Sequence, residues 1–397
     1  MKSSYINYKK KKKRRKYFIK KKYPLEFIKK PIIIFIFCLL YSIFSIKSNH
    51  QKNIIPNLNL LSNKESIGEN AKSMESISTH SNLLLPKYIK HQYDKNDKSA
   101  LFKIEDSYDY KKMKETGKDK YIYDICTVTK AKHENLYVRE FVEYYLSIGV
   151  DKFYFGDDDE ENVENLSDVL DDYVKKGLVD INYIYYRNFS HWDFFEEAFK
   201  SLKFRCKWML FIDVDEFLEF NDKNMNIKTY VNMPIFDKCD AIKIHWLMYD
   251  DNNLLYYDKR PLMQRLNHSA SHHHYNNYHK SIVRGKDFKG VMFAGTNHQP
   301  LSETVPDQCD AEGNFERLGK GILGYPKYKY CHFRHSFKTA EEFAIKLLKG
   351  MHQGSKYGLE KMVDEFFRLN TFTEEKLKVF EIIFKTTFPK YHKNNTN

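Results

Sequence analysis

The sequence has only six cysteines and no Cys-x-x-Cys pair, one long apolar run, and no excess of either charge beyond its first 30 residues. The missing Cys-x-x-Cys pair argues against a zinc ribbon or a redox motif. The first 30 residues hold 14 Lys or Arg and one Glu, which equals the whole formal charge of +13. The rest of the chain is therefore neutral, so a basic binding face is not implied and nucleic acid is not an expected partner.

The one long apolar run covers residues 31–46 and is flanked by Lys29, Lys30 and Lys47. As a helix it spans about 24 Å, which is short for a bilayer but tolerable in the thinner early secretory membranes. No small-residue cleavage pattern follows, which favours an uncleaved signal anchor over a cleaved signal peptide. The basic segment 1–30 before it predicts a cytosolic tail and a luminal remainder. We therefore expect a type II single-pass protein of the Golgi or ER membrane.

Beyond the anchor, residues 47–118 are rich in Ser, Asn, Lys and Glu and are expected to form a largely disordered stem or linker. Five cysteines follow the anchor, and because five is odd, at least one luminal thiol must stay unpaired. Four Asn-x-Ser/Thr tripeptides are glycosylation acceptors if the lumen assignment holds. They are Asn165–Ser167, Asn188–Ser190, Asn267–Ser269 and Asn394–Thr396.

From residue 121 the apolar periodicity alternates between strand and helix. Strands are predicted at 121–129, 152–156, 178–186 and 208–212, and helices at 138–148, 163–174 and 192–205, with Gly149 and Gly177 ending the first two helices. Four strands separated by helices predict an α/β fold with a doubly wound, mostly parallel sheet. Ligands bind such sheets beyond the carboxyl ends of the strands.

After residue 220 the predicted strands become shorter. They cover 240–248, 263–266, 280–284 and 291–293. Thr339–Glu342 form a capping box that opens a helix through Lys349, and residues 359–388 are expected to be helical. We assign 119–350 to one catalytic domain, including this α+β part, and 351–397 to a C-terminal helical extension.

Two acidic clusters, Asp157–Glu160 and Asp213–Glu216, are predicted at the carboxyl ends of strands, and hence at one edge of the sheet. On an extended strand residues i and i+2 point the same way, so Asp213 and Asp215 would share a face while Glu216 belongs to the other. Paired carboxylates together with substrate phosphates suit Mg²⁺ or Mn²⁺. Alternatively, the acids only cap a strand and meet solvent, since Asp-x-Asp is common by chance.

Two blocks carry a family resemblance. Ile125–Phe155, followed by Trp208–Leu218 with its Asp-Val-Asp-Glu-Phe-Leu run, resembles the family 2-like and family 92 glycosyltransferases. The resemblance implies a GT-A fold in which the second block binds metal and donor, with Asp213, Asp215 and Glu216 as the catalytic group. It implies that the first block helps to bind a nucleotide sugar, by default a UDP-sugar. The candidates for donor binding are Thr127, Lys130, Glu134, Arg139 and Asp157, together with Lys280 and Arg284 further on.

The resemblance extends loosely to residue 350. In many GT-A enzymes a C-terminal histidine completes the metal site, and His332 is the candidate, with His298 as the alternative. The spacing from histidine to lysine is about two residues longer here than in the family, and Gly156–Glu160 replaces the usual polar turn. The general base stays unassigned. An equally good interpretation of Lys280 and Arg284 is that they are solvated strand ends. The histidines at 268–279 are interpreted as part of a surface loop that binds no zinc.

The sequence thus predicts a metal-dependent glycosyltransferase, with a hexosyltransferase favoured, that acts on a glycan or glycoconjugate acceptor. A phosphatase of the haloacid dehalogenase type shares a strand that ends in Asp-x-Asp. That motif normally lies on the first strand, whereas here it follows the fourth and position 217 is Phe. A non-catalytic carbohydrate-binding protein is the third possibility, which the presence of Asp213 and Asp215 disfavours.

Overall fold

The computed structural model describes residues 102, 121–160, 163–187, 189–288, 300–301, 304–315, 325–348 and 358–392, all within the unit Glu69–Asn397. Among these residues, no helix has the length and apolar character needed to cross a membrane. The predicted anchor and cytosolic tail lie outside the described residues, as does the predicted stem except for Phe102.

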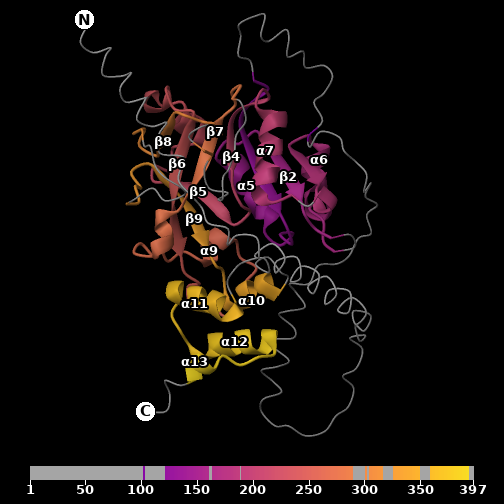
Figure 1. The fold of residues 1–397 in the computed structure, drawn as a ribbon, viewed down its shortest axis with the longest axis vertical. Coiled ribbons are helices and arrows are strands. Elements are labelled where there is room, and N and C mark those ends of the chain that lie inside the picture. The colour runs from indigo at the N-terminus through magenta and orange to yellow at the C-terminus, as the bar shows by residue number, and fades with distance from the viewer. Residues whose placement is uncertain are drawn as a thin grey trace, which may run out of the picture. The chain divides into compact units, whose positions relative to one another are not determined.

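A mixed α/β fold with a largely parallel central sheet follows the predicted alternation (Figure 1). Four strands, β1 (Tyr123–Ala131), β2 (Lys152–Asp157), β3 (Val179–Tyr183) and β4 (Cys206–Phe211), pair in parallel in the order β3-β2-β1-β4. They are connected by α5 (Val138–Ser147), α6 (Ser167–Lys175) and α7 (His191–Leu202). Gly149 and Gly177, with φ of +101° and +72°, follow α5 and α6 as the sequence predicted.

Helices cover both faces of this parallel sheet. Because side chains alternate along a strand, Ile125 packs with the α5 side chains Phe141 and Tyr145, while Cys126 and Val128 pack with α7 on the other face. All five of these side chains are fully buried. Because β1 pairs in parallel with β2 and β4, the carboxyl ends of these three strands lie at one edge of the sheet.

The second half of the sheet is mixed. β7 (His279–Arg284) runs antiparallel to β4 and to β6 (Ala241–Tyr249). β9 (Cys331–Ser336) runs parallel to β6, and β5 (Glu216–Phe220) completes the path antiparallel to β9. The short strand β8 (Gln308–Asp310) also pairs with β6. The sequence did not predict β5, β8 or β9.

Shorter helices fill the connections of this half: α8 (Ile227–Val231), α9 (Leu262–Arg265) and the 3₁₀ turns η1 (Tyr185–Arg187), η2 (Pro234–Phe236) and η3 (His274–Asn277). The strand predicted at 263–266 is wrong, because α9 occupies it. Pro261, which has no N–H for a strand ladder, starts this helix, and the Leu262 N–H donates to the Glu140 carboxylate instead. The strand predicted at 291–293 lies outside the described residues.

The C-terminal helices α10 (Ala340–Leu348), α11 (Leu359–Leu369), α12 (Glu374–Phe384) and α13 (Pro389–His392) lie together in Figure 1. Phe343 of α10 packs with Phe366 and Phe380 in one hydrophobic cluster. The capping box is confirmed, since the Glu342 N–H donates to the Thr339 hydroxyl and the Glu342 carboxylate accepts from the Thr339 N–H. The helix predicted over 359–388 is interrupted at 370–373, where the Thr373 side chain caps α12.

Disulfides join Cys126 to Cys206 and Cys239 to Cys309, and Cys331 is free and buried. The expectation that one cysteine past residue 47 stays unpaired is confirmed. The first disulfide ties the start of β4 to β1. It therefore fixes the strand that carries the acidic residues to the centre of the parallel sheet.

Candidate active site

The two predicted acidic residues lie in the turn between β4 and β5, at the carboxyl edge of the parallel strands. The expectation that they share one face of an extended strand is wrong. The chain reverses at Val214, so the carboxylates of Asp213 and Asp215 face different sets of cationic side chains. The turn therefore holds two separately neutralised carboxylates rather than a parallel pair.

Asp213 is bound from two sides. Its Oδ2 accepts from the Lys280 ammonium at 2.7 Å, and its Oδ1 lies 3.2 Å from Nε2 of His191, the first residue of α7. Burial alone would raise the pKa of Asp213, but Lys280 and His191 outweigh it and hold the pKa well below its usual range. Asp213 is therefore a carboxylate at neutral pH, with 28% of its side chain exposed to a ligand.

Glu216 lies behind this carboxylate. Its side chain is fully buried, lies 3.3 Å from the Lys280 ammonium, and accepts the Asp213 N–H at 2.9 Å. The sequence expectation that Glu216 belongs to the opposite face is wrong, because it shares Lys280 with Asp213. Burial raises the pKa of Glu216 well above its usual range in spite of Lys280. Its position supports the Asp213 backbone, and it offers no exposed atom to an acceptor.

Asp215 is buried between two lysine ammonium groups and one imidazole. Its Oδ2 accepts from the ammonium groups of Lys346 at 2.9 Å and Lys338 at 3.4 Å, and its Oδ1 lies 3.7 Å from Nδ1 of His335. Burial would raise the pKa of Asp215, but Lys346 and Lys338 lower it. Burial also lowers the pKa of His335, which keeps this imidazole neutral and able to act as a ligand.

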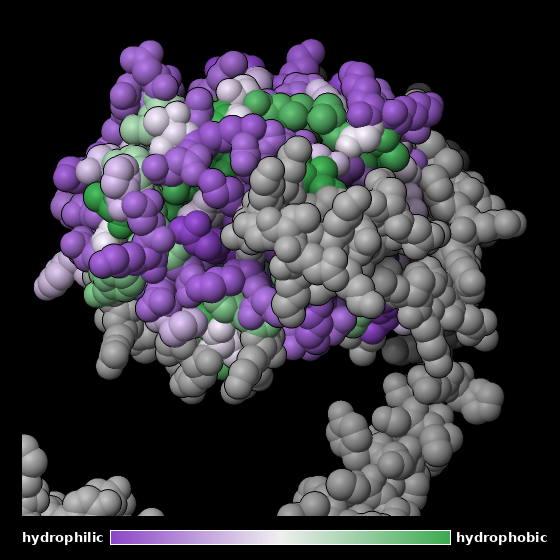
Figure 2. Space-filling view, turned by 90° about the horizontal axis from the view of Figure 1, so that it is seen from above, coloured by the Kyte–Doolittle hydropathy of each residue, from purple (hydrophilic) through white to green (hydrophobic). Residues whose placement is uncertain are grey.

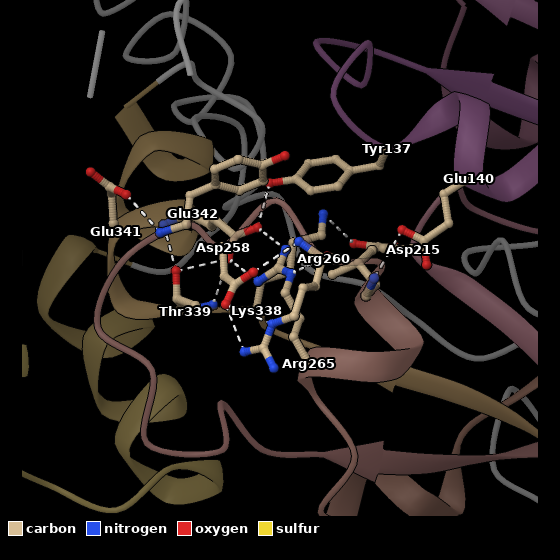
Figure 3. A network of polar contacts seen from close by, with 12 residues as sticks. Tyr137, Glu140, Asp215, Asp258, Arg260, Arg265, Lys338, Thr339, Glu341 and Glu342 are labelled. Atoms are coloured by element: carbon tan, nitrogen blue, oxygen red, sulfur yellow. Dashed lines mark hydrogen bonds and ion pairs between the residues drawn. The ribbon is translucent and has the colours of Figure 1, made fainter. Parts of the chain in front are cut away.

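A buried network holds Lys338 in this position (Figure 3). Lys338 has a left-handed backbone, with φ of +66°, and its ammonium lies 3.9 Å from the centre of the Tyr137 ring. The Tyr137 hydroxyl donates to Glu342 at 2.7 Å, and Glu342 also pairs with the guanidinium of Arg265, which is buried as well. These contacts fix the first turn of α10, and with it the lysine that faces Asp215.

A comparison with known families identifies one that matches the segment around the acidic turn. Residues 119–301 match the model of glycosyltransferase family 92. The chain resembles that family. The resemblance inferred from Ile125–Phe155 and Trp208–Leu218 is confirmed over this segment, and the match supports a glycosyltransferase. The segment contains the acidic turn and Lys280, whereas His335, Lys338 and Lys346 lie beyond it.

Solved structures give a weaker comparison. The chain is 13% identical to mannosyl-3-phosphoglycerate synthase from Rubrobacter xylanophilus, over 36% of this chain and 45% of that one, with a TM-score of 0.23. It is 12% identical to S. aureus TarS, over 62% of this chain and 43% of that one, with a TM-score of 0.29. It thus spans less than half of either protein, and scores this low carry no argument. No curated protein matches the chain.

Several of the predicted donor-binding residues lie on β1 or on the loop that follows it. Of these, Glu134 lies close to the acidic turn. It is buried, and its Oε2 lies 3.8 Å from the Lys338 ammonium. Burial raises the pKa of Glu134, which Lys338 and Lys346 partly offset. Lys130 instead binds the Phe189 carbonyl and Asp158. It lies at the same edge of the sheet, near the start of α7.

The other predicted donor-binding residues are engaged elsewhere. Thr127 is buried in the middle of β1, and the Asp157 carboxylate accepts the N–H groups of Leu166 and Asp159. Arg139 pairs with Asp172 on the exposed surfaces of α5 and α6. Arg284 lies opposite Trp208 in the ladder, near the amino end of β4, and binds backbone carbonyls. The described structure does not bring these four side chains to Asp213 or Asp215.

The histidine expected to complete the metal site lies elsewhere. His332 is opposite Glu219 in the β5–β9 ladder, with Nε2 3.4 Å from that carboxylate and 3.4 Å from the Tyr249 hydroxyl. His335, three residues along β9, is opposite Glu216 and beside Asp215 instead. His298 lies outside the described residues. The sequence signal for His335 was the longer histidine-to-lysine spacing, because His335 is three residues before Lys338.

The chemistry of Asp215 and His335 fits a divalent cation. Asp215 and His335, with a carboxylate oxygen and an imidazole nitrogen 3.7 Å apart, line a small pocket. Its other walls are Phe217, Leu262, Met263, Leu266, Arg334 and Ser336. Mn²⁺ takes this mixture of oxygen and imidazole ligands. Asp213 is close enough to oppose the deprotonation of Asp215 electrostatically. The residues present therefore fit a metal bound between Asp215 and His335.

A second group of possible ligand atoms lies at the loops that follow β1 and β2. Among the described residues, His133, Asp159 and Glu164 bring ligand atoms within 4.8 Å of one another. His133 Nδ1 lies 2.7 Å from Asp159 and 3.3 Å from Glu164. Burial would lower the pKa of His133, but the two carboxylates raise it to about 9. The group thus acts as a charged link between the two loops.

Proposed function

We propose that the chain is a metal-dependent glycosyltransferase of GT-A fold that transfers a sugar from a nucleotide-sugar donor to a glycan or glycoconjugate acceptor. The family 92 match over the acidic turn carries this proposal. Asp215 beside His335 supports the metal, and the parallel strands that end at the turn support the nucleotide site. A UDP-sugar donor and a hexosyl group are the default choices within it.

In this mechanism Asp215 and His335 would hold Mn²⁺ or Mg²⁺, which neutralises charge on the departing diphosphate. Asp213, fixed by Lys280 and by its backbone bond to Glu216, would contact the nucleotide ribose or a metal-bound water. Lys338, seated on the Tyr137 ring, adds a fixed positive charge beside the same position. The general base remains unassigned, because Glu216 is buried and protonation of Glu134 is favoured by burial.

The proposed setting is the lumen of the Golgi or ER. Two disulfides are favoured in that oxidising environment, and the predicted anchor at 31–46 would hold the domain at the membrane. Residues 119–350 would form the catalytic domain, with 351–397 as its helical extension.

The test is a nucleotide-sugar hydrolysis and transfer assay with and without Mn²⁺, on the purified chain from residue 47 onward. A glycosyltransferase releases nucleoside diphosphate in the presence of Mn²⁺ and stops after chelation. A phosphatase of the haloacid dehalogenase type would instead release phosphate from phosphomonoesters, and a non-catalytic binding protein would turn over neither substrate. Full transfer after exhaustive chelation would contradict the metal.

A further inference from the structure

Two ammonium groups approach the same oxygen of Asp215. Lys346 Nζ lies 2.9 Å and Lys338 Nζ 3.4 Å from Oδ2. A divalent cation bound by this carboxylate would be a third positive charge within a few ångströms. Because like charges repel strongly where water is scarce, the ion and both lysines cannot all keep these positions.

The two lysines differ in how firmly they are held. Lys338 is almost fully buried, with its ammonium against the Tyr137 ring and 3.8 Å from Glu134. Lys346 extends from the last turns of α10, and 23% of its side chain is exposed. Its flexible four-carbon stem allows the ammonium to change partners without movement of the helix. Lys346 is therefore the cation that is able to leave.

We propose that Lys346 is a built-in counter-ion of Asp215, which a divalent cation displaces and which then binds the diphosphate of the nucleotide donor. The proposal rests on the proposed function. With no metal present, Lys346 keeps a buried carboxylate paired, since an unpaired buried charge is costly. When a metal binds Asp215, the Lys346 ammonium is released beside the bound diphosphate. It would then donate charge-assisted hydrogen bonds to that anion.

One consequence is that the metal and the donor bind cooperatively. Metal alone must break the Lys346–Asp215 pair without compensation, whereas metal with a diphosphate gives the ammonium a new partner. Removal of the ammonium should therefore strengthen the binding of metal alone and weaken that of the diphosphate. A lysine with a purely structural role would not produce these opposite changes.

The experiment measures Mn²⁺ binding to the donor-free protein, and UDP binding at saturating Mn²⁺, by calorimetry. Lys346→Met is compared with the wild type and with Lys175→Met, an exposed lysine of α6 paired with Asp171 that loses the same charge far from the turn. We expect Mn²⁺ to bind Lys346→Met on the order of tenfold more tightly, and UDP about tenfold more weakly. Lys175→Met should match the wild type in both.

Unchanged or weaker Mn²⁺ binding in Lys346→Met overturns the counter-ion role, and unchanged UDP binding overturns the diphosphate contact. In Asp215→Asn the Lys346→Met change should have no further effect on Mn²⁺, so an additive gain also contradicts the proposal. Should Lys346→Met fail to fold, Lys346→Gln makes the same comparison. Tighter Mn²⁺ binding in Lys346→Met together with no sugar transfer by the wild type would refute the proposed function but keep the counter-ion. Transfer by the wild type together with unchanged Mn²⁺ affinity in Lys346→Met refutes this inference alone.

Discussion

At the residue scale, the turn between β4 and β5 keeps three carboxyl groups close together by giving each a different environment. Asp213 and Asp215 stay charged because lysines face them, while burial favours the protonated form of Glu216. Groups whose pKa values are pushed apart in this way are typical of functional sites. This difference suits Glu216 as the residue that supports the backbone, and Asp213 and Asp215 as the two that would face ligands.

Asp215→Asn should remove most of the transfer activity in a protein that still folds, with a lower stability because Lys346 and Lys338 lose the carboxylate that pairs with them. The substitution keeps the size of the side chain but removes the charge that would hold the metal. We expect a loss on the order of 10²-fold or more in turnover. Turnover and thermal midpoint are measured on the same sample.

The alternative, in which Asp215 only caps a strand, predicts a loss of stability without the loss of transfer. Stability would then fall while transfer stays within about threefold of the wild type, well under the expected loss. That result with a folded protein would remove Asp215 from the site.

Tyr137 offers a test of how Lys338 is positioned. Tyr137→Phe keeps the ring under the ammonium but loses the hydrogen bond to the buried Glu342, so stability should fall by about 1–3 kcal/mol with little change in the KM for the donor. Tyr137→Leu also removes the ring, and the KM should rise about three- to thirtyfold. Equal KM values for the two variants would exclude a role for the ring.

Sequence reasoning found Asp213, Asp215 and Glu216 because they are adjacent in the chain and follow an apolar strand. It missed His335, Lys346 and His191 because each comes from a different element, and nothing local marks a residue that approaches from across the fold. The choice of His332 over His335 shows the same limit. Both lie on β9, but the ladder register with β5 decides which one meets Asp215.

At the element scale, the link between the β1–α5 and β2–α6 loops depends on His133. Its folded pKa of about 9 is above the unfolded value near 6.5, so its contribution to stability is full below pH 6.5 and disappears as pH rises through 9. We chose His133→Asn because His133 has a φ of +58°, which Asn tolerates.

Chemical unfolding of wild type and His133→Asn in metal-free buffer should differ by up to about 3 kcal/mol at pH 6. The difference should shrink between pH 7 and 10. A difference that grows with pH would show that the proton on His133 does not stabilise the link.

The junction of β7 with β4 should not accept a side chain at Gly285. An added Cβ would lie 1.9 Å from the Cys206 carbonyl oxygen and 2.7 Å from that of Lys203, both backbone atoms. Gly285→Ala should therefore destabilise the fold by about 1–3 kcal/mol or more. Gly358→Ala is the matched control, because an added Cβ there meets no atom within 4 Å. Equal thermal midpoints for the two variants would contradict the close contact.

The elements of the parallel half were predictable because each strand and helix has its own apolar period, and because Gly149 and Gly177 follow α5 and α6. The mixed half was not. β5 follows the acidic turn directly, and β8 has only three residues, so neither shows a period of its own. α9 has only four residues, which is too few for the apolar period to distinguish a helix from a strand.

At the scale of the whole molecule, the proposed topology predicts that an anchor at 31–46 holds the domain in the lumen. Protease added to intact microsomes should spare the chain after residue 50 and remove the basic tail, since the bilayer would shield the folded part. Addition of detergent provides the control, because it exposes both sides. Digestion after residue 50 with the N-terminus protected would reverse the topology.

The two disulfides lie on opposite sides of the acidic turn in the sequence, so a cut between them would separate the chain into two pieces. One closes 126–206 and the other 239–309, so neither crosses the acidic turn. A cut in the exposed segment Asp222–Asn224 would therefore leave two pieces without a covalent link, with Asp215 on one and His335 on the other. Non-covalent contacts would hold them together, among them the β4–β7 and β5–β9 pairings and the ion pairs of Asp213 and Asp215. The protein could thus be made as two separately disulfide-closed halves, neither complete on its own, that bring Asp215 and His335 together when they associate.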